Sequence, residues 1–210
     1  MEPGQRVDRY RLREPLAAPA GAERWLADDP ELGRTVIIDL IGGDAEQRRR
    51  LLARARAVAR VAHPALVTLY DTGELDERIF LISEQVADRA GPPRSWRAAL
   101  ARVLGAGQGL AAAHRAGIAH GALTEGHLLV DGDGRARLAG FVPGREGAEP
   151  ATDQRAFAAL ARQQLDAAGG APAALRRILA RGAAAEWPSV AAMIDALEAV
   201  PRRRRAIALA

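Results

Sequence analysis

The segment 88–95 (DRAGPPRS) divides this 210-residue chain into two stretches with different hydrophobic periodicity. Two prolines and a glycine in eight residues end regular structure on either side. Before the segment, apolar residues alternate with polar ones or form short β-branched runs, as strands do. After it they recur every three or four residues, as in amphipathic helices. We therefore expect an α+β chain, with a mostly β part followed by a mostly α part.

The individual elements follow from the same periodicity and from turn and capping residues. We expect three strands near 10–12, 25–27 and 35–38, with a turn at Asp29-Pro30, and then a helix capped by Asp44 that runs to about Val61. Two further strands, 66–70 and 79–83, are joined by a polar turn over 71–77. Beyond the linker we expect a helix from Ser95 to Ile118, a hairpin (128–130 and 136–139) and three more helices, the last capped by Ser189.

Missing residue types limit the chemistry of the chain. It has no cysteine, which removes disulfides, thiolate catalysis and thiolate metal sites. It has no asparagine and no lysine, so all 30 basic residues are arginine, which stays protonated and forms no Schiff base. The hydrophobic share of 49% excludes low-complexity disorder. No run of 18 apolar residues occurs, so no segment is expected to span a membrane unaided.

The order of these elements, and several short segments within them, resemble a bacterial serine/threonine protein kinase. The segments are RYRLREPL, ERWLADDPELGRTVIIDL, ARAVARVAHPALVTLYDTGE, RIFLISEQV, GLAAAHRAGIAHGALTEGHLLVDGDGRARLAGF, ATDQRAFAALARQ and WPSVAAMIDALE. The resemblance implies a two-lobed protein-kinase-like fold over residues 8–200. Its small β-rich N-lobe would cover 8–88 and its shortened helical C-lobe 93–200, followed by a basic tail, 201–210.

Carried onto this chain residue by residue, the kinase pattern falls on other residue types at every position that handles phosphate. Kinases use a glycine-rich loop, a lysine held by a glutamate, an aspartate base and metal ligands. The glycines fall at Ala17, Pro19 and Ala22, and the lysine and its glutamate at Asp39 and Arg54, which we expect to pair with each other. The base falls at Ala122 and the two metal ligands at His127 and Gly140.

These substitutions predict a pseudokinase that is not an enzyme, with no cofactor and no metal. The residues that pack the interior of a kinase are retained, and we expect Val58, His120, Phe141 and Asp153 to form a structural spine. The positions that pack a kinase interior match the family pattern, and the positions that bind phosphate do not. This contrast favours a protein-interaction or scaffolding role in bacterial signalling or cell-envelope regulation. Two alternatives stay open. One is a nucleotide-binding, non-catalytic switch that uses a vestigial hinge at Ser83, Glu84, Gln85 and Val86, and the other is an atypical serine/threonine kinase.

Only about a dozen residues separate Gly140 from Asp153, where an active kinase has a long activation segment. A similarly shortened kinase-like domain occurs in mycobacterial lipid II flippases, where it precedes a membrane span and binds a forkhead-associated (FHA) domain protein through a phosphothreonine. The resemblance implies a protein partner of that kind, with Thr124 and Thr152 as candidate threonines.

Three further sequence features have simpler interpretations. The sequence Asp131-Gly-Asp-Gly resembles a calcium loop, but Arg135 takes the place of an oxygen ligand, so we expect a hairpin turn. The dispersed arginines and core-like tryptophans favour no nucleic-acid partner. The four arginines of the tail, Arg202, Arg203, Arg204 and Arg205, indicate either a disordered basic end or the cytosolic flank of a membrane anchor on an anionic surface.

Overall fold

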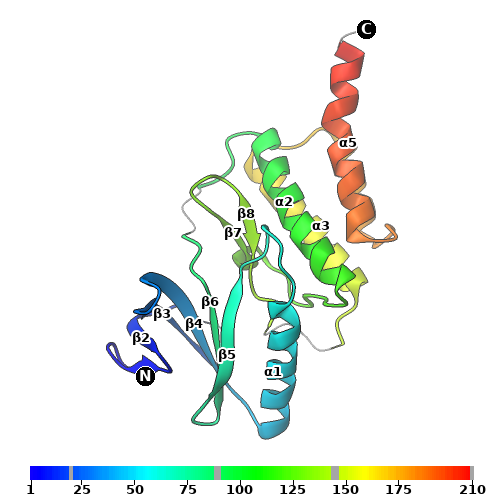
Figure 1. Ribbon diagram of the computed structural model, residues 1–210. Helices are drawn as coiled ribbons and strands as arrows, with labels where there is room; N and C mark the ends of the chain where they lie inside the picture. Colours follow the sequence, from blue (N-terminus) through cyan, green and yellow to red (C-terminus); the bar gives the residue numbers. More distant parts are fainter. Residues whose placement is uncertain (19–20, 88–90, 143–146, 209–210) are drawn as a thin grey trace. The chain divides into compact units, whose positions relative to one another are not determined.

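The computed structural model describes residues 1–18, 21–87, 91–142 and 147–208, with side chains through Val200. It contains two compact units (Figure 1). The first comprises residues 1–62 and 67–85, and the second comprises 63–66 and 86–210. The change of unit near residue 86 falls just before the Pro/Gly-rich segment.

The first unit is an antiparallel sheet with one helix beside it. Its strands are β1 (Arg6–Val7), β2 (Tyr10–Leu16), β3 (Ala22–Asp29), β4 (Arg34–Gly42), β5 (Leu69–Leu75) and β6 (Arg78–Glu84), arranged in the order β1-β2-β3-β4-β6-β5. Alternate residues of β4, Val36, Ile38 and Leu40, are fully buried, as period-two side-chain placement requires. They pack with Tyr10 and Leu12 into one hydrophobic cluster, which stabilises the curled sheet.

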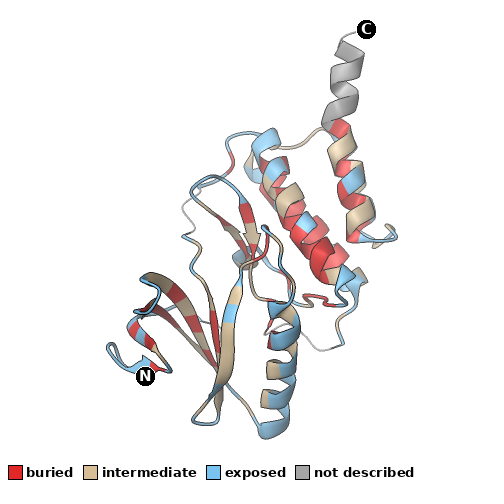
Figure 2. Cartoon of the chain, viewed as in Figure 1, coloured by how far each residue is buried: buried red, intermediate tan, exposed pale blue. Residues whose placement is uncertain are grey.

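Helix α1 (Ala45–Ala59) begins at the predicted cap and ends two residues earlier than expected. The Asp44 carboxylate accepts the backbone N–H of Gln47 at 2.8 Å, and the Gln47 side chain accepts the backbone N–H of Asp44 at 2.9 Å. This reciprocal capping box satisfies two donors that a helix start leaves free. Ala55 is the buried residue of α1, and most of the helix surface faces solvent (Figure 2).

The predicted bounds of the strand at 66–70 and of the turn that follows it are wrong. Residues 71–75 were expected to form a polar turn, but they are strand β5, and the turn is confined to Asp76 and Glu77, both with positive φ. Backbone pairing with β6 outweighs the polar composition of this segment. Gly73 permits that pairing, because a Cβ there would lie 2.5 Å from the Phe80 ring.

The second unit is mostly helical, as predicted. It contains α2 (Trp96–Arg115), the 3-10 turn η1 (Glu125–His127), a hairpin of β7 (Leu128–Val130) and β8 (Ala136–Leu138), then α3 (Pro150–Ala167), α4 (Ala173–Ala183) and α5 (Val190–Ala208). The hydroxyls of Ser95 and Ser189 accept backbone N–H groups at the starts of α2 and α5. Helix α2 packs against both α3 and α5 (Figure 1).

A close helix crossing lies in the core of the second unit, where Gly107 of α2 meets α3 and α5. A Cβ at Gly107 would lie 2.6 Å from Ile194 and 2.7 Å from Phe157, so only glycine allows this approach. Among the helices within the described residues, none has the length and apolar character needed to cross a bilayer. The side chains of the arginine tail, 202–205, lie outside the described residues.

Candidate functional site

The catalytic-loop region of the second unit is built around a buried carboxylate, Asp153 of α3. Its two oxygens accept the backbone N–H groups of His120 (2.6 Å) and Gly121 (2.7 Å) and bond to Nε2 of His114 (2.8 Å). Burial alone would raise the pKa of Asp153, but the hydrogen bonds from His114 and from the Gly121 and His120 amides lower it below the usual range. The group is therefore ionised, and it ties the loop to both α2 and α3.

The His120 side chain is fixed at both ring nitrogens. Nε2 bonds to the Ala139 carbonyl at 3.0 Å, so it carries the proton and donates, while Nδ1 accepts the backbone N–H of Ala122 at 3.3 Å. The ring also packs on Phe141, with centroids 4.7 Å apart. A neutral, fully buried His120 with both nitrogens occupied has a structural role at this point.

His127 and Gly140, the two positions that the kinase pattern assigns to metal ligands, are in close contact. The His127 ring occupies the space that a side chain at residue 140 would take. Gly140 has φ +84°, which favours glycine, and a Cβ there would lie 2.7 Å from Nε2 of His127 and closer still to its Cδ2. The His127 ring also packs 4.7 Å from the His120 ring. Any side chain at residue 140 would have to displace the His127 imidazole.

Thr124 and Ala122 lie on the exposed side of the same loop. The backbone N–H of Thr124 donates to Nδ1 of His127 at 3.1 Å, and the Thr124 hydroxyl lies 3.0 Å from the same nitrogen. This arrangement fixes the direction of the His127 ring. The other candidate threonine, Thr152, is exposed in the first turn of α3.

In the first unit, Asp39 of β4 pairs with Arg24 of β3. Arg24 Nε lies 2.6 Å from one carboxylate oxygen and Nη2 lies 3.2 Å from the other. The pair is partly buried, with 17% of the Asp39 side chain and 37% of the Arg24 side chain exposed. The prediction that Asp39 pairs with Arg54 is therefore wrong in its partner: the two strands place Arg24 directly opposite Asp39.

Three of the four predicted spine residues meet within the second unit: His120, Phe141 and Asp153. Val58 lies on α1 of the first unit and is only half-buried. Of the predicted loop positions, Ala17 and Ala22 flank the β2–β3 connection and Pro19 lies outside the described residues.

The predicted hinge residues run from the end of β6 into the second unit, and they are partly engaged in the sheet. The backbone N–H of Glu84 donates to the Thr68 carbonyl at 2.9 Å, and the Gln85 side chain accepts a hydrogen bond from Thr35. Ser83 pairs with Ile37 in the strand ladder, and Val86 belongs to the second unit.

Two partners in these clusters, Arg24 and His114, were missed from the sequence. The turn expected at Asp29-Pro30 would put residue 24 opposite residue 35, whereas the observed turn is centred between Glu31 and Leu32 and puts residue 24 opposite 39. His114 carries no local signal, since its contact with Asp153 spans 39 residues.

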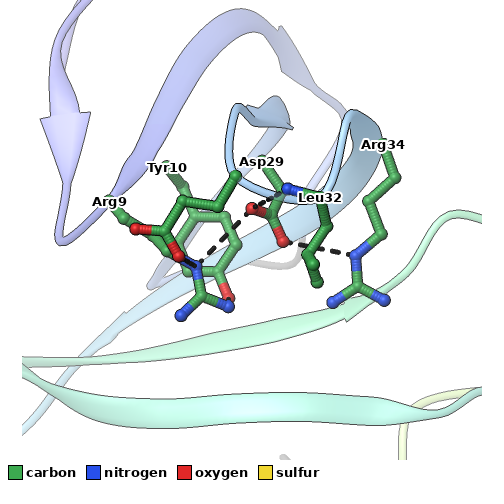
Figure 3. Close-up of polar contacts among 6 residues, drawn as sticks. Arg9, Tyr10, Asp29, Leu32 and Arg34 are labelled. Carbon is green, nitrogen blue, oxygen red and sulfur yellow. Dashed lines mark hydrogen bonds and ion pairs between the residues drawn. The ribbon is translucent and has the colours of Figure 1, made fainter.

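A second buried carboxylate, Asp29, organises the β3–β4 turn (Figure 3). It accepts the Leu32 backbone N–H at 3.3 Å and the Arg34 Nε–H at 3.3 Å, and Arg9 lies 3.5 Å away. Burial would raise the pKa of Asp29, but the hydrogen bonds from Leu32 and Arg34 and the charge of Arg9 lower it. An open cavity beside Asp29 is lined by Asp28, Pro30 and Gly33, among others. Because Asp29 pairs with Arg9 and Arg34 there, we interpret this region as a turn held in place by ion pairs.

Comparison with solved structures defines the class of fold. The chain matches the crystal structure of the PknI kinase domain of Mycobacterium tuberculosis with a TM-score of 0.77 over 94% of this chain and 98% of that one, at 22% identity. The predicted α+β protein-kinase-like fold is therefore confirmed. No protein-family model matches the chain.

Curated relatives are bacterial serine/threonine-protein kinases. The chain is 33% identical over 147 residues to PknL of Mycobacterium tuberculosis, which covers 63% of this chain and 36% of that protein. It is also 33% identical over 155 residues to the probable serine/threonine-protein kinase pknA2 of Bifidobacterium longum, covering 67% of this chain and 20% of that protein. The chain thus spans about a third or less of these relatives.

These comparisons contradict the prediction that the chain is not an enzyme. The relatives to which the chain is 33% identical are named as serine/threonine-protein kinases, and this finding points to an enzyme. The resemblance to the flippase domain and the assignment of individual site residues stay predictions. Within the described part of the chain, no three metal-ligating side chains cluster together.

Proposed function

We propose that this kinase-like domain serves bacterial serine/threonine kinase signalling chiefly as a protein-interaction module. We further propose that any phosphoryl transfer it performs does not depend on residues 39, 122, 127 and 140. The observation that carries the proposal is the packing of the His127 imidazole against Gly140, which leaves no room for a side chain at residue 140. The Asp39–Arg24 ion pair supports it independently, because Asp39 is already committed to a neighbouring strand.

The experiment compares Asp39→Asn and His127→Ala with the wild-type chain in two assays. Quantitative co-precipitation from the native bacterium should recover the same partners with all three chains. Transfer of labelled phosphate from ATP with magnesium should also be equal in all three. A transfer activity that falls with either substitution would show that these positions carry catalysis and would overturn the proposal.

An atypical serine/threonine kinase is the second candidate, favoured by the named kinases to which the chain is 33% identical. An autophosphorylation assay at high protein concentration tests it. Label that appears in proportion to protein concentration and is unaffected by Asp39→Asn would support a kinase with a different set of catalytic residues. A thermal-shift titration with ATP and magnesium reports separately on nucleotide binding at residues 84–86.

The partner we propose is a protein that reads phosphothreonine, such as one with an FHA domain. Thr124 and Thr152 are both exposed, so either hydroxyl is accessible to a kinase. Mass spectrometry after treatment with an active serine/threonine kinase should find phosphate on one of them, and Thr124→Val with Thr152→Val should abolish the partner's binding. The proposed location is the cytoplasmic side of the membrane, which fractionation of the native bacterium tests.

A further inference from the structure

Helix α1 carries a local excess of positive charge, as does the arginine tail, 202–205. Residues 44–60 contain six arginines and two acidic residues, a net charge of +4 that equals the formal charge of the whole chain. The remaining residues therefore carry 24 charges of each sign. A local excess of this kind produces a field that attracts anionic partners, and it is independent of the fold itself.

Three of the six arginines form one line along the solvent side of α1. At 3.6 residues per turn, Arg49, Arg56 and Arg60 fall within about 60° of one another, with Ala53 between them. All four residues are exposed. We call Arg49, Arg56 and Arg60 the arginine stripe. On the opposite side, Leu51, Ala55 and Val58 are buried or half-buried, so α1 is anchored by its other face.

The stripe is largely unneutralised. Arg49 pairs with Glu46, which it shares with Arg50. Across the ranges 1–18, 21–87, 91–142 and 147–200, no carboxylate lies within ion-pair distance of Arg56 or Arg60. Arg56 and Arg60 lie four residues apart at the C-terminal end of α1, where their like charges repel each other, so an anion beside them would be attracted to both.

We propose that the arginine stripe binds an acidic segment of a partner protein in an extended conformation. This inference rests on the proposed interaction role and names the chemistry of the partner. Along the helix axis, Arg56 and Arg60 are about 6 Å apart and Arg49 and Arg56 about 10.5 Å. An extended chain advances about 3.3 Å per residue and places alternate side chains on one face. Carboxylates two residues apart, about 6.6 Å, therefore match Arg56 and Arg60, and carboxylates four residues apart, about 13 Å, lie within reach of Arg49 and Arg56 because arginine side chains are long. The ligand would carry acidic residues in the order i, i+4 and i+6, all on one face of the extended chain.

The composition of α1 favours a peptide over the other polyanions. The exposed large apolar side chains within the described residues are Leu16, Leu32 and Tyr70, and none of them is on α1, so the helix offers nothing to insert into a bilayer. The helix also has no aromatic side chain on which nucleic-acid bases would stack.

Fluorescence anisotropy with a labelled nine-residue peptide tests the inference. The peptide has glutamate at positions 2, 6 and 8 and alanine or serine elsewhere, and a second peptide has glutamine at the same three positions. Arg56→Gln combined with Arg60→Gln should weaken binding of the glutamate peptide by about tenfold. Arg162→Gln combined with Arg177→Gln removes the same charge from exposed positions of α3 and α4 and should change it by less than about twofold.

Three outcomes would overturn the inference: equal weakening by both double variants, equal binding of the glutamine peptide, or tighter binding to phosphatidylglycerol vesicles or a single-stranded oligonucleotide through the same residues. Co-precipitation from the native bacterium separates this inference from the proposed function. If the double variant Arg56→Gln with Arg60→Gln recovers the same partners as the wild-type chain, the arginine stripe does not bind them. That result would refute this inference and leave the proposed interaction role in place.

Discussion

At the scale of single residues, Asp153 and Gly140 show how the catalytic-loop region is held. Asp153 is a fully buried carboxylate with three donors, so its charge is stabilised only while those donors stay in place. Gly140 has a backbone conformation and a neighbouring His127 ring that both exclude other residues. Each residue gives a prediction with a matched control.

Asp153→Asn should lower the free energy of unfolding by about 2–4 kcal/mol, because the amide replaces an ionised acceptor and turns a donor toward His114 or the backbone amides. Urea unfolding followed by circular dichroism measures this. Asp166→Asn, an exposed carboxylate on the same helix, is the control and should change stability by less than about 0.5 kcal/mol. Equal effects of the two substitutions would refute the anchoring role.

The depressed pKa of Asp153 predicts the direction of a pH dependence. Because its pKa is lower in the folded than in the unfolded chain, its contribution to stability is present above the unfolded value and disappears as pH falls through the folded value. The free energy of unfolding should therefore fall as pH drops below about 4. The free energy of unfolding of the Asp153→Asn variant should fall less steeply over that pH range in the same urea measurements. A parallel decline in both proteins would contradict the assignment.

Gly140→Ala should be more destabilising than Gly169→Ala, although both glycines have nearly the same φ, +84° and +85°. The conformational cost of alanine at positive φ, about 1 kcal/mol, is common to both. Only residue 140 adds a collision with His127, because no heavy atom lies within 4 Å of a Cβ at 169. Thermal unfolding should show Gly140→Ala costing about 1–3 kcal/mol more, and His127→Ala should remove most of that difference.

At the scale of elements, helix α1 depends on its ends, because only Ala55 is buried along its length. Asp44→Ala removes the side-chain acceptor for the Gln47 backbone N–H, although the backbone N–H of residue 44 can still donate to Gln47, and should lower stability by about 1 kcal/mol, measured by urea unfolding. Asp133→Ala, an exposed carboxylate in the β7–β8 turn, is the control and should be near neutral. A neutral Asp44→Ala would mean that packing against β5 alone holds the helix.

The elements also show what a sequence can and cannot predict. Local signals located the α1, α2 and α5 caps, the β7–β8 hairpin and most strands, because each depends on a few neighbouring residues. The predicted bounds of β5 were wrong because backbone pairing with β6, a tertiary interaction, outweighs the polar composition of 71–75. The predicted partner of Asp39 was wrong because the β3–β4 turn is centred two residues later than Asp29-Pro30, which places Arg24 opposite Asp39.

At the scale of the whole molecule, the resemblance to kinases predicted the fold correctly and the enzymatic status incorrectly. Conserved order of elements determines the fold even at 22% identity to a solved kinase domain. Residue types at single positions are a weaker basis for predicting activity, because relatives that are 33% identical to the chain are named as kinases. The proposed function rests on the His127–Gly140 packing and the Asp39–Arg24 pair.

The most direct measurement is phosphate transfer from labelled ATP with magnesium, made side by side on the wild-type chain and on Asp39→Asn. Circular dichroism confirms that both are folded. We expect the same incorporation of label in the two proteins, because Asp39 is bound to Arg24 and is proposed not to act in transfer. Incorporation that falls tenfold or more in Asp39→Asn would contradict it.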